Sequence, residues 1–187
     1  MSGKRYLSDQ FLIASPGLQD PNFARGVTLI CQHDEDGAMG LMVNRPSDYH
    51  LGDVLKQMNI STDLLAISDA PVLIGGPVQP ERGFVLHSPE RDWESSLRVS
   101  DQLMVTTSRD ILDAMANGEG PKHAMVMLGY SGWTAGQLED ELIENAWLTC
   151  QSSTQILFET PAEQRWLAAA QQLGIDLRLM TDYAGHA

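Results

Sequence analysis

Two arginines, Arg45 and Arg82, are the side chains best suited to bind a charged ligand. Arg45 closely follows the apolar run 38–43, and Arg82 directly precedes the apolar run 83–87. A guanidinium can bind a carboxylate or a phosphate through two parallel hydrogen bonds. Because the ends of strands present side chains at the rim of a sheet, we expect the two arginines to lie close together and to bound one anion-binding cleft.

Four neighbouring residues complete this candidate ligand site: Asn44, His87, Tyr130 and Trp133. They stand beside the predicted strand ends or in the segment 129–133 (GYSGW), which we expect to form a loop between a strand and a helix. Amide groups at the start of that helix would add donors for an anion. A second interpretation stays open, in which both arginines pair with some of the 25 carboxylates and order loops, and the tryptophan only packs against the helix.

The hydroxyl and thiol nucleophiles do not stand in a catalytic pattern. A nucleophile elbow around Ser131 would need glycine at position 133, where tryptophan stands. Cys31 and Cys150 lie in apolar runs without a neighbouring lysine or arginine, so nothing in the sequence lowers their pKa. We expect two free, buried thiols, which are typical of a reducing compartment.

The sequence carries no fingerprint of a metal or a cofactor. The acidic run 34–36 lacks the further oxygen ligands of a calcium loop, and the five histidines do not have zinc-binding spacing. No glycine-rich phosphate-binding motif occurs. We therefore predict no metal site and no cofactor, and without a complete catalytic motif the question of enzymatic activity stays open.

The net charge of the chain argues against two kinds of partner, nucleic acids and anionic membranes. The 187 residues carry 25 acidic and 12 basic side chains, a formal net charge of −13, and no run of basic residues is longer than two. Such a chain repels duplex DNA and anionic membrane surfaces. No segment is apolar enough for a signal peptide or a membrane helix, so we expect a cytoplasmic protein.

Hydrophobic periodicity predicts short strands with helices between them. The predicted strands cover residues 27–33, 38–43, 72–74, 83–87, 96–99, 103–107, 124–129, 146–150 and 155–158. The first two form a hairpin, with Gly37 at a positive φ in its turn. The predicted helices cover residues 51–58, 110–116, about 134–145 and about 160–174. This irregular order favours an α+β fold with a mostly antiparallel sheet and about four helices packed around it. We see no domain boundary, so residues 1–187 are expected to form a single domain.

Three long strings resemble the AlgH/YqgE family of bacterial proteins: 11–46, 75–87 (GGPVQPERGFVLH) and 129–150. They occur in order at compatible separations and cover most of the chain. The resemblance implies a cytosolic α+β domain whose sheet is bifurcated and rolled into a pseudo-barrel. The family's molecular activity is largely unassigned, and one member is labelled a regulator of alginate synthesis.

We therefore expect a non-enzymatic binding or regulatory protein. One alternative is an enzyme or sensor that binds a small anionic ligand at Arg45 and Arg82. The other, a DNA-binding transcriptional regulator, is disfavoured by the acidity. A partner protein or a small anionic ligand is expected as the partner, and the oligomeric state is left open.

Overall fold

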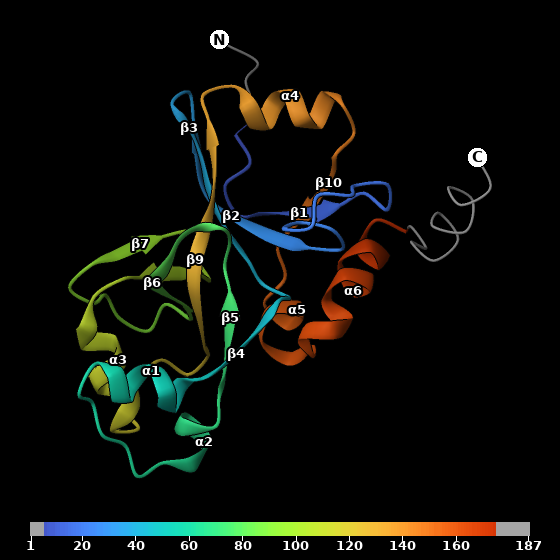
Figure 1. Ribbon diagram of the computed structural model, residues 1–187. Coiled ribbons are helices and arrows are strands. Elements are labelled where there is room, and N and C mark those ends of the chain that lie inside the picture. Colours follow the sequence, from blue (N-terminus) through green and yellow to red (C-terminus); the bar gives the residue numbers. More distant parts are fainter. Residues whose placement is uncertain (1–5, 175–187) are drawn as a thin grey trace.

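The computed structural model describes residues 6–174, which form a mixed α+β fold around one curled sheet of ten strands (Figure 1). The strands are β1 (Gln10–Ala14), β2 (Val27–Asp34), β3 (Gly37–Met42), β4 (Pro46–His50), β5 (Pro71–Ile74), β6 (Val78–His87), β7 (Ser96–Arg98), β8 (Met104–Thr106), β9 (Ala124–Thr134) and β10 (Trp147–Gln151). Their order is β10-β1-β2-β3-β9-β6-β8-β7, with β4 paired to β5 and β5 to β9. The expected α+β class with a mostly antiparallel, rolled sheet is confirmed.

Six α-helices lie around the sheet within residues 6–174, two more than expected. They are α1 (Leu51–Gln57), α2 (Leu65–Ser68), α3 (Arg109–Ala116), α4 (Gln137–Ile143), α5 (Thr154–Glu159) and α6 (Arg165–Gln172). In Figure 1, α4 lies across the end of the tall arm formed by β2, β3 and β9, whereas α1, α2 and α3 gather at the opposite end. Helices α5 and α6 lie at the side of the sheet, below β1 and β10.

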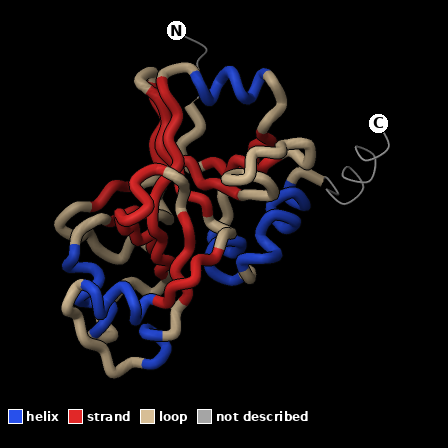
Figure 2. The backbone as a smooth tube through the Cα atoms, viewed as in Figure 1, coloured by secondary structure: helices blue, strands red, loops and turns tan. Residues whose placement is uncertain are grey.

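The sheet branches at β9, the longest strand. The second half of β9 pairs with β3 through Ser131–Thr134, whereas its first half lies between β5 and β6. The pairing of β5 with β9 is parallel, and the other strand pairs of the described chain are antiparallel. Figure 2 shows the consequence, because strands run from the arm into the lower part of the molecule without interruption. The expected bifurcation is therefore present.

Glycines allow the close backbone contact at this branch point. A Cβ atom at Gly75 would lie 2.3 Å from the carbonyl oxygen of Gly129, and one at Gly129 would lie 2.4 Å from the carbonyl oxygen of Gly76. Gly129 also has a φ of 77°, a conformation that glycine adopts readily. The chain directly after β5 therefore meets the middle of β9 at a distance that excludes any side chain.

The hairpin of β2 and β3 forms as the sequence predicts. The carboxylate of Asp34 accepts a hydrogen bond of 2.8 Å from the backbone N–H of Asp36, which fixes the turn. Gly37 has a φ of 137°, so its expected positive φ is confirmed. Both strands contribute buried residues to the core, Leu29 and Leu41 among them.

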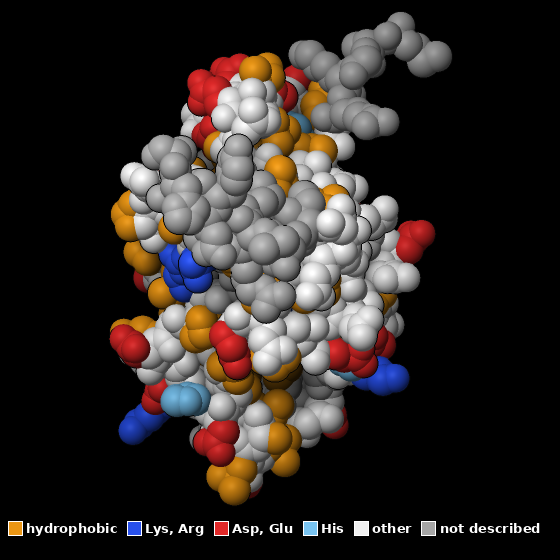
Figure 3. All heavy atoms as spheres, turned by 90° about the vertical axis from the view of Figure 1, so that its right-hand side faces the viewer, with side chains coloured by type: hydrophobic (Ala, Val, Ile, Leu, Met, Phe, Trp, Pro, Cys, Tyr) orange, Lys and Arg blue, Asp and Glu red, His pale blue; other side chains and the backbone are white. Residues whose placement is uncertain are grey.

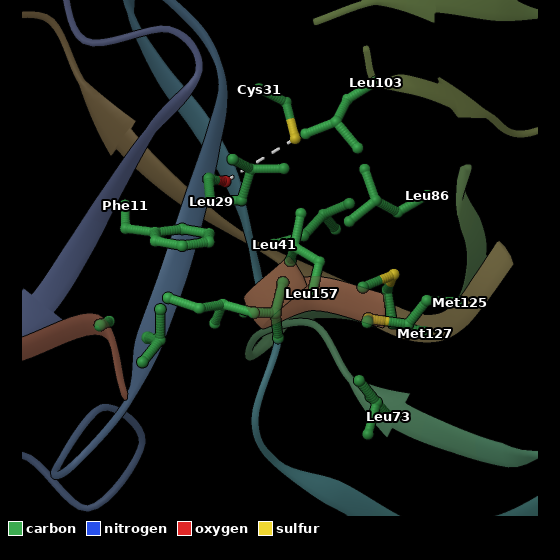
Figure 4. Packing of buried hydrophobic residues seen from close by; sticks show 14 of the residues in the cluster. Phe11, Leu29, Cys31, Leu41, Leu73, Leu86, Leu103, Met125, Met127 and Leu157 are labelled. Atoms are coloured by element: carbon green, nitrogen blue, oxygen red, sulfur yellow. Dashed lines mark hydrogen bonds between the residues drawn. The ribbon is translucent and has the colours of Figure 1, made fainter. Parts of the chain in front are cut away.

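The core consists of three clusters of buried side chains. The largest, part of which is drawn in Figure 4, lies among the sheet strands and helices α5 and α6; there Phe11, Leu29, Leu41, Met127 and Leu157 surround a common centre. A second cluster packs α1 and α3 against β5, β6 and β9. A third packs α4 against the arm. The sheet is thus covered by helices at both ends and at one side.

Three expectations about local structure are wrong. Residues 155–158 form part of helix α5 instead of a strand, because Ser153 caps the helix and accepts a 3.2 Å hydrogen bond from the N–H of Ile156. A short apolar run does not distinguish a strand from a buried helix. The segment 130–133 continues strand β9 and is not a loop. Arg82 lies within strand β6, not before it.

Candidate functional site

A groove of about 890 Å³ opens between the arm and strands β6, β7 and β8, and we call it the concave groove. Its apolar lining consists of Ala38, Met39, Val78, Phe84, Leu97, Val105, Tyr130 and Trp133. Its polar lining consists of Gln32, Asp36, Arg82, Ser95, Ser96, Thr107 and Thr134, and Gly132 also lines it. Phe84 and Val105 also belong to the main core cluster, so the groove is an opening into the interior of the curled sheet. Ligand sites commonly occur in the mouths of such barrels.

Among the residues that the structure describes, Arg82 is the one basic residue in the lining of the concave groove. Its guanidinium carbon lies 5.1 Å from the centre of the Phe84 ring, and that ring meets the Tyr130 ring edge to face, with centres 5.8 Å apart. Within residues 6–174, the guanidinium of Arg82 makes no ion pair and no hydrogen bond. Its hydrogen-bond donors are therefore available to a ligand.

Strand β9 supplies the opposite wall because its side chains alternate between two faces. Ser131 and Trp133 are buried, whereas Gly132 and Thr134 are exposed at the groove. A Cβ atom at Gly132 would meet only the Tyr130 ring, at an ordinary contact distance of 3.5 Å. The backbone does not require glycine at position 132, and the absence of a side chain there leaves space in the groove.

Asn44 and Arg45 do not line the concave groove, because they hold the loop before β2. The guanidinium of Arg45 donates hydrogen bonds to the carbonyl oxygens of Pro21 (3.0 Å), Asn22 (2.7 Å) and Ala24 (2.8 Å). The side chain of Asn44 accepts a hydrogen bond from the N–H of Val27 and donates one to a carbonyl of the same loop. Arg45 therefore orders a loop, as the second interpretation of the sequence expected. Its partners are main-chain carbonyl oxygens and not carboxylates.

Replacing Arg45 by alanine should lower the free energy of unfolding by about 1–3 kcal/mol, because three charge-assisted hydrogen bonds are lost at a partly exposed site. Urea denaturation measures the change. Arg98, whose guanidinium makes a single 3.3 Å hydrogen bond to the carbonyl of Ser100, provides the control. Arg98→Ala should change stability by less than about 0.5 kcal/mol. Equal losses in the two variants would contradict the loop-holding role.

His87 is fully buried, and its ring belongs to a chain of hydrogen bonds that ties β6, β7 and β8 together. The ring Nδ1 lies 2.8 Å from the carbonyl oxygen of Ser88, which can only accept, so Nδ1 carries the proton. The other nitrogen, Nε2, accepts a 2.7 Å hydrogen bond from the hydroxyl of Thr106, which in turn accepts one of 2.8 Å from Ser96. The imidazole is thus fully engaged and does not reach the concave groove.

Burial lowers the pKa of His87 below its ordinary value of 6.5. Below pH 6.5 the unfolded chain therefore takes up the proton more readily than the folded protein, and stability should fall as the pH decreases toward the folded-state pKa. Unfolding by urea at a series of pH values tests this dependence. His87→Gln should flatten the fall between pH 6.5 and the folded-state pKa. If variant and wild type lose stability in parallel, another group is responsible.

Trp133 faces away from the concave groove and packs against α4. Its indole N–H donates a 3.0 Å hydrogen bond to Oε1 of Glu141, and the indole N–H of Trp147 donates one of 2.9 Å to the same oxygen. The two rings lie edge to face, with centres 6.3 Å apart. The indole of Trp133 thus joins α4 to the sheet, as the structural interpretation expected, while its place in β9 contributes to the groove wall.

A second groove, of about 600 Å³, lies beside the concave groove, between α1, α3 and β6; we call it the helical groove. Its lining includes Val54 of α1, Met58 directly after that helix, Leu112 of α3, Gly83 and Leu128. Phe84 and Thr107 line both grooves. Sequence reasoning missed this groove, because it forms between helices that are distant in the chain. It also missed Met39 and Gln32, although their places in the β2–β3 hairpin predict that they point to one face.

The nucleophiles considered from the sequence are buried. The hydroxyl of Ser131, which is fully buried, lies 3.2 Å from the carbonyl oxygen of Gly75, to which it donates. Both cysteines are free thiols, and burial raises the pKa of Cys31 to about 12 and also raises the pKa of Cys150. A thiol held in its protonated form is a poor nucleophile.

The surface and the titratable groups offer few other sites. On the visible part of the face in Figure 3, lysine and arginine side chains occur as separate spots among acidic ones. In the part of the chain that the structure describes, no three histidine, cysteine or acidic side chains are grouped to hold a metal ion. Among residues 6–174, no helix has the length and apolar composition that crossing a lipid bilayer requires.

The fold and the groove define a class of protein: a curled, branched sheet with a groove lined by Arg82, whose guanidinium has no ion pair or hydrogen bond within residues 6–174. A family profile described as AlgH-like matches residues 11–178. The chain belongs to the AlgH-like family, which confirms the resemblance in the three sequence strings.

Relatives match over nearly the whole chain. A UPF0301 protein of Xanthomonas campestris pv. campestris is 59% identical over 181 residues, which cover 97% of this chain and 96% of the relative. A UPF0301 protein of Xanthomonas oryzae pv. oryzae is 58% identical over the same shares. The solution structure of the AlgH protein from Pseudomonas aeruginosa has 47% identity and a TM-score of 0.81, covering 97% of this chain and 96% of that one.

A crystal structure from Corynebacterium diphtheriae shares the fold at only 20% identity. Its TM-score is 0.74, and the match covers 97% of this chain and 94% of the other. The branched, curled sheet therefore persists where most side chains differ.

Proposed function

We propose that this protein is a binding domain that holds a small ligand with an anionic group in the concave groove, with Arg82 as its charged contact. One observation carries the proposal: Arg82 stands in a groove of about 890 Å³ over the ring of Phe84, without a carboxylate partner among residues 6–174. An arginine in that position presents its donors to a ligand instead of to the protein. The proposed site keeps Arg82 and Tyr130 from the ligand site expected from the sequence, and it does not include Arg45.

The proposed activity is binding without chemistry. Ser131 and Cys31, two nucleophiles within the family strings, are buried, and both ring nitrogens of His87 make hydrogen bonds within the fold. The acidic groups that could act as general bases near Arg82 are the exposed carboxylates of Asp36 and Glu81. Exposed carboxylates without a partner to position them are weak catalysts. Ligand binding, with a regulatory consequence, is the function these features support.

A direct role on DNA is not part of the proposal. With a net charge of −13 and no run of basic residues longer than two, the protein is poorly suited to neutralise the phosphates of a duplex. We expect no sequence-dependent complex with duplex DNA at physiological salt. Fluorescence anisotropy with labelled genomic fragments is the measurement, and a submicromolar complex that survives competitor DNA would contradict the expectation.

Thermal denaturation with benzoate, succinate and phosphate tests the binding function. At least one of these anions should raise the melting temperature, since a ligand that binds only the folded state stabilises it. Arg82→Ala should abolish the increase. Arg91 is a matched control, because its guanidinium also lies over an aromatic ring, that of Trp93 at 3.7 Å, and lines neither groove.

The control variant Arg91→Ala should keep the full response to the anion. The proposal fails if none of the three anions changes the melting temperature, or if Arg82→Ala responds like the wild type. It also fails if Arg91→Ala loses the response to the same degree, because the effect then reflects net charge and not the groove.

We also propose a cytoplasmic location. Both cysteines are free and buried, at positions where a disulfide between them does not form. Free thiols are usual in a reducing compartment.

A further inference from the structure

We propose that the ligand of the concave groove is an amphiphilic monoanion, a molecule with an apolar chain or ring system and a single carboxylate or similar head group. The inference rests on the proposed function and specifies it. The head group binds the guanidinium of Arg82, and the apolar body enters the curled sheet beside Met39, Phe84 and Leu97.

Charge alone does not supply enough affinity for a compact, hydrophilic anion. The groove offers one exposed arginine, and a single ion pair in contact with water contributes little. The net charge of −13 opposes the approach of anions, most strongly of those with several charges. Asp36, at the same groove, adds a local negative charge. A ligand with one negative charge and a second source of binding energy fits these conditions best.

Apolar surface in the groove supplies that second source. Leu97, on the short edge strand β7, is 38% exposed and faces the groove. On the opposite wall Met39 is only partly buried and packs against the main core cluster, and Leu97 pairs with Val105 of that cluster. An apolar ligand between these walls would remove from water the surface that the fold leaves uncovered.

The space available also suits such a body. A volume of about 890 Å³ is within the range of small-molecule sites. Gly132 and Ser96 contribute only small groups to the lining, and among residues 6–174 Arg82 is the only basic residue that lines the groove. A carboxylic acid with a medium-length acyl chain or an aromatic ring would therefore place its single charge at Arg82.

Calorimetric titration with hexanoate, octanoate and decanoate, each below its critical micelle concentration, tests the ligand class. Every buried methylene should increase affinity about fourfold. The neutral alcohols of the same chain lengths should show the same increase at lower affinity. Arg82→Gln should reduce the affinity for each acid to that of the matching alcohol, and Arg91→Gln should not.

Two glycine variants distinguish the grooves. Gly132→Leu should fill the concave groove and weaken decanoate binding at least tenfold, with no backbone clash at the new Cβ. Gly83→Leu should fill the helical groove, since nothing lies within 4 Å of its Cβ position, and should leave binding unchanged. Sedimentation with phosphatidylglycerol vesicles distinguishes binding of a free amphiphile from binding to a membrane surface. We expect the protein to stay in the supernatant.

The possible outcomes separate the inference from the proposed function. Benzoate or succinate could raise the melting temperature of the wild type but not of Arg82→Ala, while affinity does not rise from hexanoate to decanoate. The amphiphilic ligand class is then wrong, and the anion site at Arg82 stands. If Gly83→Leu and not Gly132→Leu removes binding, the site is the helical groove. If vesicles sediment the protein and free decanoate does not bind, the inference is overturned in favour of a membrane surface.

Discussion

Replacing Gly129 by alanine should lower the free energy of unfolding by about 3 kcal/mol or more. The new Cβ would lie 2.4 Å from the carbonyl oxygen of Gly76, and the φ of 77° is unfavourable for alanine. Backbone atoms form the obstacle, so no side-chain rotation relieves it. Chemical denaturation by urea, followed by tryptophan fluorescence, measures the loss.

Gly132→Ala is the matched control for this prediction, because it lies three residues further along the same strand. Its Cβ would make only an ordinary 3.5 Å contact with the Tyr130 ring. We expect a change within about 1 kcal/mol. If both alanine variants unfold at the same urea concentration as the wild type, the close contact of Gly129 with Gly76 is not a determinant of the branched sheet.

Replacing Glu141 by alanine should cost about 2–4 kcal/mol. One carboxylate oxygen accepts the indole N–H groups of Trp133 and Trp147, whose residues are 6% and 4% exposed. Removing it leaves two nearly buried donors without a partner, and each such donor costs about 1–3 kcal/mol. Urea denaturation gives the value, and near-ultraviolet circular dichroism should show that the two indoles lose their fixed environment.

The matched variant Glu141→Gln keeps an oxygen at the same place and should lose less than about 1 kcal/mol. Glu144, an exposed residue at the end of α4, supplies a second control, and Glu144→Ala should be close to neutral. A loss in Glu144→Ala as large as that in Glu141→Ala would indicate that the stability of α4 itself, and not the indole contacts, determines the effect.

Much of the fold could be predicted, because many of its elements carry local signals. The turn at Gly37 needs a residue that tolerates positive φ, and the hairpin follows from the apolar runs on either side. The end of α3 at Asn117 and Gly118 also depends on local conformation. Where the local signal was weak, as in the run 155–158, an apolar segment was assigned to the wrong element.

The candidate site was predicted only in part, because strand ends do not reveal which distant segments they contact. Arg82 and Tyr130 do share a groove. Arg45 is held by carbonyl groups more than 20 residues away in sequence, and no pattern in its neighbourhood indicates that loop. His87 ends a strand as predicted, but its ring is held by a chain of hydrogen bonds through Thr106 and Ser96 from two other strands.

The segment 129–133 shows why function and fold were hard to separate. Its glycines suggest a loop that binds a ligand, yet Gly129 is required by the contact with Gly76, whereas Gly132 is free to accept a side chain. Only the packing of β5 against β9 distinguishes the two roles. The same strand therefore contains a structural glycine and, three residues later, one that keeps a groove open.

The position of a bound ligand tests the central claim most directly. Two methionines report on the two grooves, Met39 on the concave groove and Met58 on the helical groove. With methyl-labelled methionine, nuclear Overhauser contacts from decanoate should reach the methyl group of Met39 and the ring of Tyr130, and not Met58. Contacts confined to Met58, or no contacts at saturating decanoate, would contradict a ligand site at Arg82.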